Sequence, residues 1–405
     1  MLKKIELEEA VGILCRKVHD IGTEIVGLID AHKRVLAKDI LSPINHPPFD
    51  RSPLDGFALI AEDTKEASRD KPVELEVIEE VHAGEYPTRE LSRGRATRIM
   101  TGAPIPINAD CIIRQEETLL EKRKVRVLKE LKKWDNYCFK GEDFQKDQLI
   151  LENGTVLKSA EIGVLACLGI NEVAVYKKPR VGILSTGDEL VDVKNELTDG
   201  KIYNSNLYAI ATRITELVGE PIILGNVCDD PETMSKKIRL GVQEADLLIT
   251  TGGVSVGKKD IVKDVMSKLE ANLLFWRVKI KPGSPVLASE LDNKLVISLS
   301  GNPSAAMISL ELLVRPLLNQ MSHKKELKLI RENAVLVEDF SKKSNIRRFL
   351  RGKVTDTPAG KIVKPTKSMQ TSSIMNCILN SNCLIDIPTG SPPLKEGERV
   401  EIIII

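Results

Sequence analysis

The chain has 405 residues, of which 42% are apolar, but it contains only seven Phe, five Tyr and two Trp. Lys and Arg number 59 and Asp and Glu 58, so the net charge of +1 shows no basic excess of the kind that nucleic-acid binding requires. Ordinary Gly and Pro contents exclude a collagen-like or broadly disordered chain, and at roughly 150 residues per domain the length predicts two to four domains.

The amino-terminal residues MLKKIELEEAVG are charged and contain no apolar signal segment. The longest uncharged stretches, 368–385 and 295–310, are interrupted by polar or turn residues and predict no membrane helix. Seven Cys and five His form no CxxC pair and no zinc-ligand spacing. We therefore expect a cytoplasmic protein with reduced thiols and with no membrane or nucleic-acid partner.

The first 44 residues predict a helix, with Ala10, Ile13, Leu14 and Val18 spaced by three and four, and then a second short helical piece. From His46 onward prolines indicate a loop. The runs VELEVIEEV, ATRIMTGA, CIIRQEE and KVRVLKEL then predict strands. Residues 141–178 are expected to be extended.

Between residue 180 and about residue 321, predicted strands alternate with predicted helices. Strands are expected at 181–184, 222–227, 247–251, 273–280, 286–288 and 295–298, and helices at 204–218, 231–244, 260–269 and 303–318. This alternation predicts a doubly wound α/β domain with a largely parallel sheet. The stretch MSHKKELKLIREN predicts a basic helical connector, and the short β runs after it predict a small barrel.

Three loops rich in Gly, Ser and Thr follow predicted strands of the α/β domain. They contain Ser185, Thr186, Gly187, Asp188 and Glu189; Gly252, Gly253, Ser255 and Gly257; and Ser300, Gly301, Asn302 and Pro303. Ligands bind at the carboxyl ends of parallel strands, and glycine lets backbone amides approach an anion, so three such loops favour a phosphate-bearing ligand. Residues 252–258 match most of a P-loop. Lys259 stands where that motif needs a hydroxyl, which disfavours a P-loop NTPase.

Charged residues accompany these loops. Glu189 and Asp260 follow glycine-rich turns, and carboxylates beside lysines are a usual arrangement for a divalent cation acting on a phosphoanhydride. Of the neighbouring pair Asp229 and Asp230, one is expected to be a solvated surface charge. Asp55, taken alone, predicts only a turn.

Taken together, these segments resemble the molybdopterin molybdenumtransferase family, which includes the bacterial MoeA proteins and the gephyrin E domain. The resemblance is carried, in family order, by SPLDGFA, RIMTGAPIPINADCII, KGED, GILSTGDELV, GKIYNSN, ITTGGVSVGKKD, IKPGSP and LSGNPSAA. It implies a homodimer of elongated four-domain subunits. The implied domains are an extended linker domain of residues 1–44 and 141–179, an inserted β-rich lid domain of 45–140, an α/β molybdopterin-binding domain of 180–321 and a small C-terminal β-barrel of 328–405.

The resemblance also implies a reaction, in which molybdenum from molybdate is inserted into adenylyl-molybdopterin and AMP is released, with Mg²⁺ required. By motif, the implied catalytic residues are Asp55, Thr101, Asp143, Glu189, Asp260 and Lys281, of which Glu189 and Asp260 hold the metal. The loops above, together with Arg277, Pro282 and Gly283, are implied to bind substrate. Arg351 and Ser372 fall where the family is thought to hold molybdate.

The sequence also departs from the family pattern. Ser284 stands where the family has a lysine, which removes one positive charge from the expected molybdate site. The alternatives are a molybdopterin adenylyltransferase, which would lack the first 175 residues and the terminal barrel, a scaffold of the gephyrin E type, and a divergent copy that handles tungstate. The adenylyltransferase and apo-molybdoenzymes are the further partners that the resemblance implies.

Overall fold

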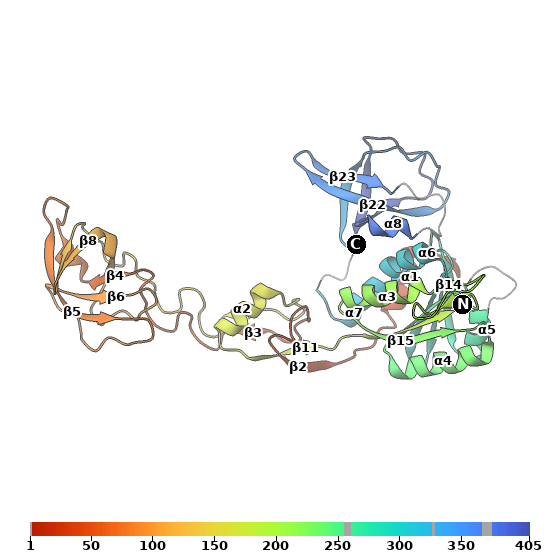
Figure 1. Ribbon diagram of the computed structural model, residues 1–405, viewed down its shortest axis with the longest axis horizontal. Helices are drawn as coiled ribbons and strands as arrows, with labels where there is room; N and C mark the ends of the chain where they lie inside the picture. The colour runs from red at the N-terminus through yellow and green to blue at the C-terminus, as the bar shows by residue number, and fades with distance from the viewer. Residues whose placement is uncertain (1, 255–260, 326–328, 367–374) are drawn as a thin grey trace. The chain divides into compact units, whose positions relative to one another are not determined.

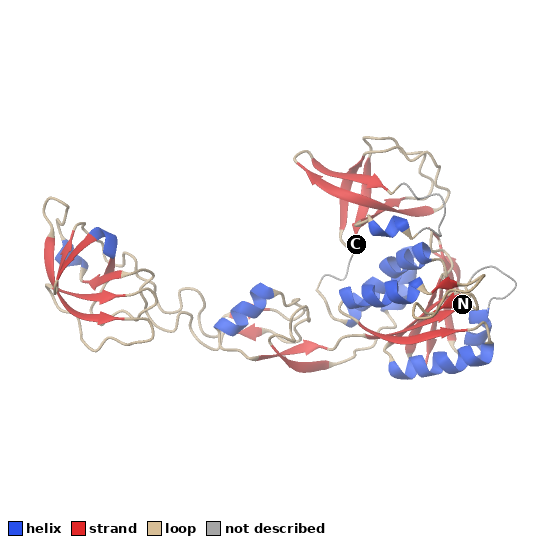
Figure 2. Ribbon diagram, in the orientation of Figure 1, coloured by secondary structure: helices blue, strands red, loops and turns tan. Residues whose placement is uncertain are grey.

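The computed structural model describes residues 2–254, 261–325, 329–366 and 375–405 (Figures 1 and 2). The chain divides into two compact units, which are described separately. Unit 1 comprises Met1–Ala37, Gly154–Lys158 and Glu172–Ile405, and unit 2 comprises Lys38–Asn153 and Ser159–Asn171. None of the described helices is both long enough and apolar enough to cross a lipid bilayer.

A seven-stranded sheet forms the centre of unit 1, in the order β1-β17-β19-β20-β16-β12-β15. Its strands are β1 (Leu2–Ile5), β12 (Arg180–Thr186), β15 (Glu220–Val227), β16 (Leu247–Thr251), β17 (Asn272–Val278), β19 (Leu287–Leu291) and β20 (Lys294–Leu299). β19 runs antiparallel to both neighbours, and all other pairings are parallel. The predicted doubly wound α/β fold is confirmed, because β12, β16 and β20 are buried on both faces, as parallel strands covered by helices must be.

Helices cover both faces of this sheet, as Figure 1 shows. α4 (Pro231–Glu244) and α5 (Ile261–Lys268) pack on one face through a cluster that includes Met234, Ile238 and Val265. The helices on the other face are α1 (Leu7–Cys15), α3 (Ser205–Glu216), α6 (Pro303–Ser309) and α7 (Arg315–Met321). The sheet therefore lies between two apolar layers, and its strand ends are where polar loops are exposed.

The predicted helix over 303–318 is continuous but not uniform. The five residues between α6 and α7, Leu310–Val314, form a π-helical turn, η3. Glu311 in this turn is buried, and its carboxylate accepts hydrogen bonds from Nε of Arg213 at 2.6 Å and from Nη1 of Arg315 at 3.3 Å. These ion pairs satisfy a buried carboxylate that would otherwise be strongly destabilising.

A small barrel forms the carboxyl-terminal part of unit 1. Its strands are β21 (Arg331–Leu336), β22 (Arg347–Thr357), β23 (Gly360–Pro365), β24 (Cys383–Ile387) and β25 (Arg399–Ile404). The pairing of β22 with β24 closes the five strands into the predicted barrel, and the short strand β18 (Ile280–Lys281) of the α/β part joins its edge at β22. The short helix α8 (Asn376–Leu379) precedes β24. Two smaller pairs complete the unit: β2 (Thr23–Gly27) with β11 (Glu172–Tyr176), and β13 (Leu190–Val191) with β14 (Ile202–Tyr203).

Unit 2 contains a six-stranded sheet of its own, in the order β7-β4-β6-β5-β9-β8. Its strands are β4 (Gly56–Leu59), β5 (Val73–Val81), β6 (Arg95–Ile99), β7 (Cys111–Arg114), β8 (Thr118–Glu121) and β9 (Lys124–Val127). The pair β3 (Ile40–Leu41) and β10 (Leu149–Leu151), the helix α2 (Ser159–Cys167) and the 3-10 turns η1 (Ala61–Thr64) and η2 (Gln115–Glu117) complete it. VELEVIEEV is the strand β5, and the other three predicted β runs each begin in a strand (β6, β7 and β9) but end in turns or loops, of which η2 is one.

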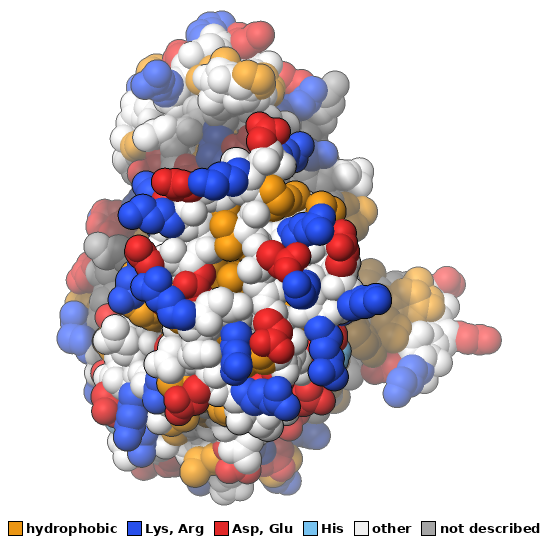
Figure 3. All heavy atoms as spheres, turned by 90° about the vertical axis from the view of Figure 1, so that its left-hand side faces the viewer, with side chains coloured by type: hydrophobic (Ala, Val, Ile, Leu, Met, Phe, Trp, Pro, Cys, Tyr) orange, Lys and Arg blue, Asp and Glu red, His pale blue; other side chains and the backbone are white. Residues whose placement is uncertain are grey.

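Acidic and basic side chains alternate over the sheet surface of unit 2. Glu74 pairs with Lys124 and Arg126, and Glu80 pairs with Arg98. Figure 3, which views the molecule from the side where β5 and β8 lie in Figure 1, shows blue and red side chains interspersed on this face. Mixed charge of this kind fits the balanced composition and gives no field of one sign to attract a polyanion.

Three secondary-structure predictions are wrong. The second helical piece in the first 44 residues is the strand β2, which pairs with β11 from 149 residues further along the chain. The segment 141–178 contains the helix α2, whose apolar residues are spread around its circumference and therefore give no clear period. The connector after Met321 is not helical in its described residues, because Arg331 already begins β21 and pairs with Ile403.

Candidate functional site

The carboxyl ends of six strands of the large sheet meet at one edge. β12, β15, β16 and β20 run parallel, and β17 and β1 run in the same direction because β19 reverses the chain between β17 and β20. The three predicted glycine-containing loops, at 185–189, 251–254 and 300–303, therefore lie at this edge, and the turn 277–284 begins at the same edge. In open α/β sheets this edge is where ligands bind.

Two of the glycines let the loops touch one another. Gly252 has φ +95°, and a Cβ there would clash with the carbonyl oxygen of Thr186 and lie 2.7 Å from its Oγ1. A Cβ on Gly301 would lie 3.4 Å from Cα of Gly252. The three loops thus pack closely, and at Gly252 the contact with Thr186 requires a residue without a side chain.

A buried polar network fixes the strand ends beneath these loops. Thr251 Oγ1 donates to Ser185 Oγ at 3.1 Å, and Ser185 Oγ donates to Oδ1 of Asn204 at 3.1 Å. Thr186 Oγ1 donates to the carbonyl oxygen of Thr251 at 3.2 Å. Asn204 also caps α3 by accepting from the backbone N–H of Leu207. Ser185 and Thr186 are therefore held rigidly by neighbouring strands.

Asn206 belongs to this site and is absent from the predicted site residues. Its Nδ2 donates to the carbonyl oxygen of Gly301 at 2.8 Å, and so links α3 to the loop after β20. Its Oδ1 is buried without a hydrogen-bond partner in the part of the chain that the structure describes. The segment GKIYNSN contains this residue, but only the fold shows that it reaches the third loop.

Asp188 and Glu189 are exposed at the same edge. Oδ1 of Asp188 accepts from the backbone N–H of Asp229 at 3.0 Å, and Nζ of Lys201 donates to the Asp188 carbonyl at 2.6 Å. The carboxylate of Glu189 folds over Gly187, where a Cβ would lie 2.5 Å from Oε2. Glu189 therefore presents a carboxylate at the loop surface, while Asp188 braces the loop after β15.

The pair Asp229 and Asp230 separates into two roles. Asp230 caps α4, because its carboxylate accepts from the backbone N–H of Thr233 at 2.8 Å. Hydrogen bonds from the side chain and backbone of Thr233 hold the pKa of Asp230 below its usual value. Asp230 is thus a structural residue, whereas the backbone of Asp229 contacts the site loop through Asp188.

The turn after β17 is built around Gly283, which has φ +93° and lies against Ser309, whose hydroxyl donates to the Gly283 carbonyl at 3.1 Å. Ser284 Oγ donates to the carbonyl oxygen of Val278 at 2.8 Å, so this hydroxyl is already used within the turn. Pro282 precedes Gly283, and Lys281 is exposed, with no ion pair to any residue in the described ranges. Lys279 is not available in the same way, because its Nζ pairs with Glu6 at 2.6 Å.

The loop after β20 begins α6. The backbone N–H of Asn302 donates to Ser300 Oγ at 3.2 Å, and the Asn302 side chain accepts from the backbone N–H of Ala305 at 3.5 Å. Pro303 occupies the first turn of the helix, where its missing N–H leaves nothing unsatisfied. This loop therefore has the structural role of beginning α6, which its glycine and proline predict from the local sequence.

Arg351 lies in the wall of a cavity of about 310 Å³ between the α/β part and the barrel. The cavity is lined by Ala209, Thr212, Arg213, Glu216, Met307, Glu311, Arg351, Ile378, Ser381 and Ile405. Only 4% of Arg351 is exposed; Nη1 donates to Ser381 Oγ at 3.0 Å, and Nε has no partner among the residues described. Burial lowers the pKa of this guanidinium. A buried cation with an unused donor is suited to binding an anion.

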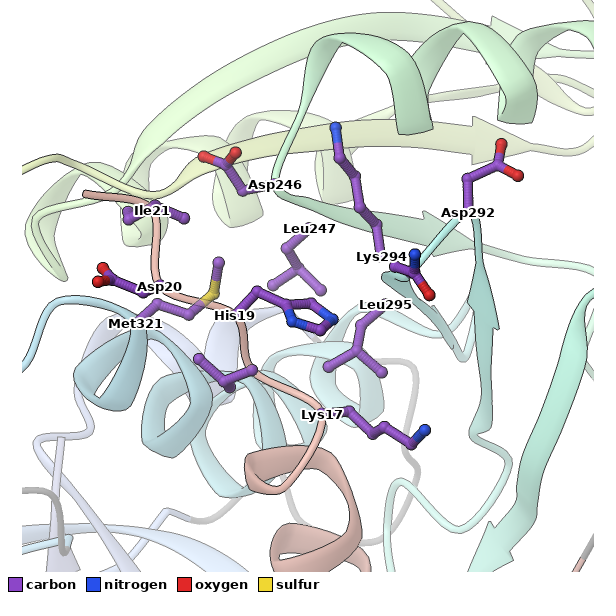
Figure 4. Close-up of a pocket in the computed structure, with 12 residues that line it drawn as sticks. Lys17, His19, Asp20, Ile21, Asp246, Leu247, Asp292, Lys294, Leu295 and Met321 are labelled. Atoms are coloured by element: carbon purple, nitrogen blue, oxygen red, sulfur yellow. The ribbon is translucent and has the colours of Figure 1, made fainter.

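A second cavity, of about 280 Å³, lies at the opposite edge of the sheet, where β16 and β20 begin (Figure 4). His19, Asp246 and Lys294 are among its lining residues, and none of the predicted site residues that the structure describes lines it. It therefore belongs to a different part of the molecule from the glycine-containing loops.

Unit 2 brings two predicted residues together. Oδ1 of Asp55 accepts hydrogen bonds from the backbone N–H and from the hydroxyl of Thr101, both at 2.7 Å. These bonds hold the pKa of Asp55 below its usual value. Asp143 is also exposed, and its own backbone N–H donates to the His46 carbonyl oxygen at 3.1 Å. Asp55 and Thr101 therefore form a fixed, exposed anionic pair.

Four predicted residues lie outside the described ranges, namely Ser255, Gly257, Asp260 and Ser372. Of the two expected Mg²⁺ ligands, Glu189 is therefore the one that the structure describes. Within the described ranges no three His, Cys, Asp or Glu side chains gather into a metal-binding cluster. Mg²⁺ is usually held by one or two carboxylates, waters and substrate phosphates, so the exposed carboxylate of Glu189 beside the glycine-containing loops fits this ion.

Three protein-family models match the chain in succession. Residues 5–169 match the MoeA N-terminal region (domain I and II), residues 182–320 match a probable molybdopterin binding domain, and residues 333–405 match the MoeA C-terminal region (domain IV).

Curated relatives and a solved structure are similar to this chain over its full length. The molybdopterin molybdenumtransferase of Bacillus subtilis (strain 168) is 37% identical, covering 100% of this chain and 96% of that protein. The protein of the same name from Staphylococcus aureus (strain COL) is 35% identical, covering 99% and 95%. The crystal structure of a molybdopterin biosynthesis MoeA protein from Pyrococcus horikoshii superimposes with a TM-score of 0.85 at 33% identity, covering 99% of each chain.

Proposed function

Because this chain belongs to the molybdopterin molybdenumtransferase family and acts in molybdenum cofactor biosynthesis, we propose that it inserts molybdenum from molybdate into adenylyl-molybdopterin. In this reaction the phosphoanhydride bond of the adenylylated substrate is broken, and AMP leaves. Full-length similarity to molybdenumtransferases supports this activity over that of a single-domain adenylyltransferase.

The observation that carries the proposal is the packing of three glycine-containing loops at the carboxyl edge of one sheet. Gly252, which has no room for a Cβ beside Thr186, also lies against Gly301 of the third loop, so the backbone of these loops is close-packed over the strand ends. Backbone N–H groups at such an edge bind phosphate oxygens. Asn206 adds a buried amide oxygen that can accept a hydrogen bond from a bound ligand.

The charged residues that we assign to the substrates and to Mg²⁺ carry opposite signs. Lys281, Arg277 and Arg351 are the cations that we assign to the oxyanions of the substrates, because charge-assisted hydrogen bonds are roughly twice as strong as neutral ones. Glu189 and Asp260 are the carboxylates that would hold Mg²⁺. When bound, the ion would neutralise charge on the phosphoanhydride.

The residues of unit 2 act, in this proposal, from the partner subunit of a homodimer. Asp55, Thr101 and Asp143 lie in a different unit from the glycine-containing loops. The hydrogen bonds from Thr101 favour the ionised form of the Asp55 carboxylate and fix its direction. A fixed, charged side chain is suited to completing a site on another subunit. The molybdopterin adenylyltransferase and apo-molybdoenzymes would deliver substrate and receive product.

Measurement of AMP release from adenylyl-molybdopterin, with and without molybdate, tests the proposal. We expect release to depend on both molybdate and Mg²⁺. A parallel reaction with tungstate measures the choice of metal. Binding of adenylyl-molybdopterin without any metal-dependent AMP release would favour a scaffold function and contradict the proposed one.

A further inference from the structure

The last residues of β17 break the alternation of the strand. Phe275 and Val278 both face the core that includes α1, α3, α6 and α7, although regular alternation would place residues 275 and 277 on one face. Arg277 between them has φ +71°, a backbone conformation that is uncommon for a residue with a side chain. Arg277 nevertheless keeps the register of the sheet, since Trp276 and Val278 pair with Lys3 and Ile5 and its own N–H donates to the Val286 carbonyl oxygen at 2.8 Å, so its left-handed backbone redirects the side chain without adding a residue to the strand.

The redirected guanidinium lies on an indole ring. Cζ of Arg277 is 4.4 Å from the centre of the Trp276 ring, and Nε is buried without a hydrogen-bond partner among the described residues. Stacking on Trp276 is thus the contact that sets the plane of this guanidinium. The indole is itself fixed, because it packs against the apolar cluster beneath α4 and α5.

A second cation approaches the same ring. Nζ of Lys263, in the first turn of α5, lies 5.3 Å from the centre of the Trp276 ring. Neither Lys263 nor Arg277 forms an ion pair with a carboxylate in the part of the chain that the structure describes. Both cations are therefore within 5.3 Å of the centre of one ring, with no carboxylate to neutralise either charge among the described residues. Their shared ring holds them at the carboxyl edge of the sheet.

We propose that Trp276 is a positioning residue, which holds the guanidinium of Arg277 toward a tetrahedral oxyanion, and that Lys263 supplies the second positive charge. The inference rests on the proposed function, in which Arg277 binds substrate, and extends the site to two residues that no motif indicates. Molybdate and the phosphate group of the nucleotide are both tetrahedral oxyanions, so the experiment includes each of them.

The chain has two tryptophans, Trp134 and Trp276, which allows a direct measurement of binding. In a Trp134→Phe protein, Trp276 is the sole indole, and its fluorescence is recorded during titration with sodium molybdate, AMP or sodium phosphate. We expect a saturable change with molybdate or AMP. A response to molybdate alone identifies the metal oxyanion as the ligand, and a response to AMP identifies the nucleotide phosphate.

Three substitutions in this protein test which residues carry the response. Arg277→Gly removes the guanidinium and suits a φ of +71°, so we expect normal folding and no fluorescence response. Lys263→Met should weaken binding at least threefold. Lys268→Met, an exposed change on the same helix, is the matched control and should bind as before.

Measurements of activity distinguish a positioning role of Trp276 from a role in packing alone. Trp276→Leu should raise KM for the oxyanion substrate about tenfold with kcat within about twofold, whereas Trp276→Phe, which keeps an aromatic face, should stay within about threefold of wild type. Equal effects of Leu and Phe would contradict a positioning role.

The fluorescence titration does not require turnover, so it separates the two proposals. Absence of a response to all three anions, or an unchanged response in Arg277→Gly, overturns the inference even if AMP release is intact. A response that requires Arg277 in a protein without AMP release supports the inference and contradicts the proposed function.

Discussion

At the residue scale, the candidate site contains two kinds of side chain. Ser185, Thr251 and Asn204 are buried and satisfy one another in a hydrogen-bond network, so their role is to hold the loops. Glu189 and Lys281 are exposed charges without an ion-pair partner in the described ranges. Substitution of the second kind should change chemistry with little effect on stability, because surface side chains contribute little to folding.

Replacement of Glu189 by Ala should reduce AMP release about a hundredfold or more, because loss of charge stabilisation at such a site typically costs a few kcal/mol. The fold should be unaffected, since the carboxylate is exposed. The measurement is kcat at several Mg²⁺ concentrations. Glu196→Ala, which removes an exposed carboxylate from the loop after β13, is the control. Turnover and Mg²⁺ dependence like those of wild type in Glu189→Ala would show that this carboxylate does not hold the ion.

Replacement of Ser284 by Lys should tighten molybdate binding roughly ten- to hundredfold, because a restored charge-assisted contact is worth about 1.5 to 3 kcal/mol. The gain is reduced by loss of the hydrogen bond from Ser284 to Val278. Calorimetric titration with molybdate measures the change. Lys279 pairs with Glu6 and so is poorly placed to compensate. An unchanged or weaker affinity would show that another cation already replaces the missing lysine.

At the element scale, the ends of strands and helices determine the site. Gly252→Ala tests this, because φ +95° and the clash with Thr186 leave no room for a Cβ. We expect a loss of about 2 to 4 kcal/mol in the free energy of unfolding and at least a tenfold fall in AMP release. Denaturant unfolding and the AMP assay measure both. Gly163→Ala in α2, where a Cβ meets nothing within 4 Å, should instead leave stability equal or higher.

The cap of α4 makes a prediction about pH. The pKa of Asp230 is lowered by hydrogen bonds from Thr233, so the cap stabilises the fold above the unfolded pKa of Asp and is lost as pH falls through the lower, folded value. Asp230→Ala should therefore have a lower Tm than wild type at pH 7, and the difference should shrink toward pH 3. Asp230→Asn, which keeps an acceptor, should lose less. A Tm difference that is constant with pH would mean that the charged cap is not responsible.

At the scale of the whole molecule, the predicted site residues are divided between the two units. Asp55, Thr101 and Asp143 lie in unit 2, and the glycine-containing loops lie in unit 1. Residues so divided can form one site between two copies of the chain, as the proposed homodimer requires.

Complementation tests this arrangement. An Asp55→Ala chain and a Glu189→Ala chain should each be inactive, and a mixture of them should regain part of the activity, because heterodimers contain one intact composite site. The measurement is AMP release after subunit exchange, with exchange confirmed by differently tagged chains. Confirmed heterodimers without any recovered activity would place all of these residues within one subunit's site.

Local sequence determined much of this protein. The helix α4 is bounded by Asp230-Pro231 and was predictable to the residue, because its cap and first-turn proline act within one turn of the chain. The buried strand β16 and the three glycine-containing loops were also predictable from the sequence, since apolar runs and glycine turns are properties of short segments. The succession of motifs indicated the family before any strand was paired.

Only the tertiary structure decided which of these segments meet. The strand β2 and the start of β21 were misassigned because each is stabilised by a partner far along the chain, β11 and β25 respectively. Distant segments likewise bring Asn206 to Gly301 and Lys263 to Trp276, and bury Arg351 between the barrel and the α/β part. The free energy of these contacts comes from burial and pairing across the fold, which local sequence does not encode.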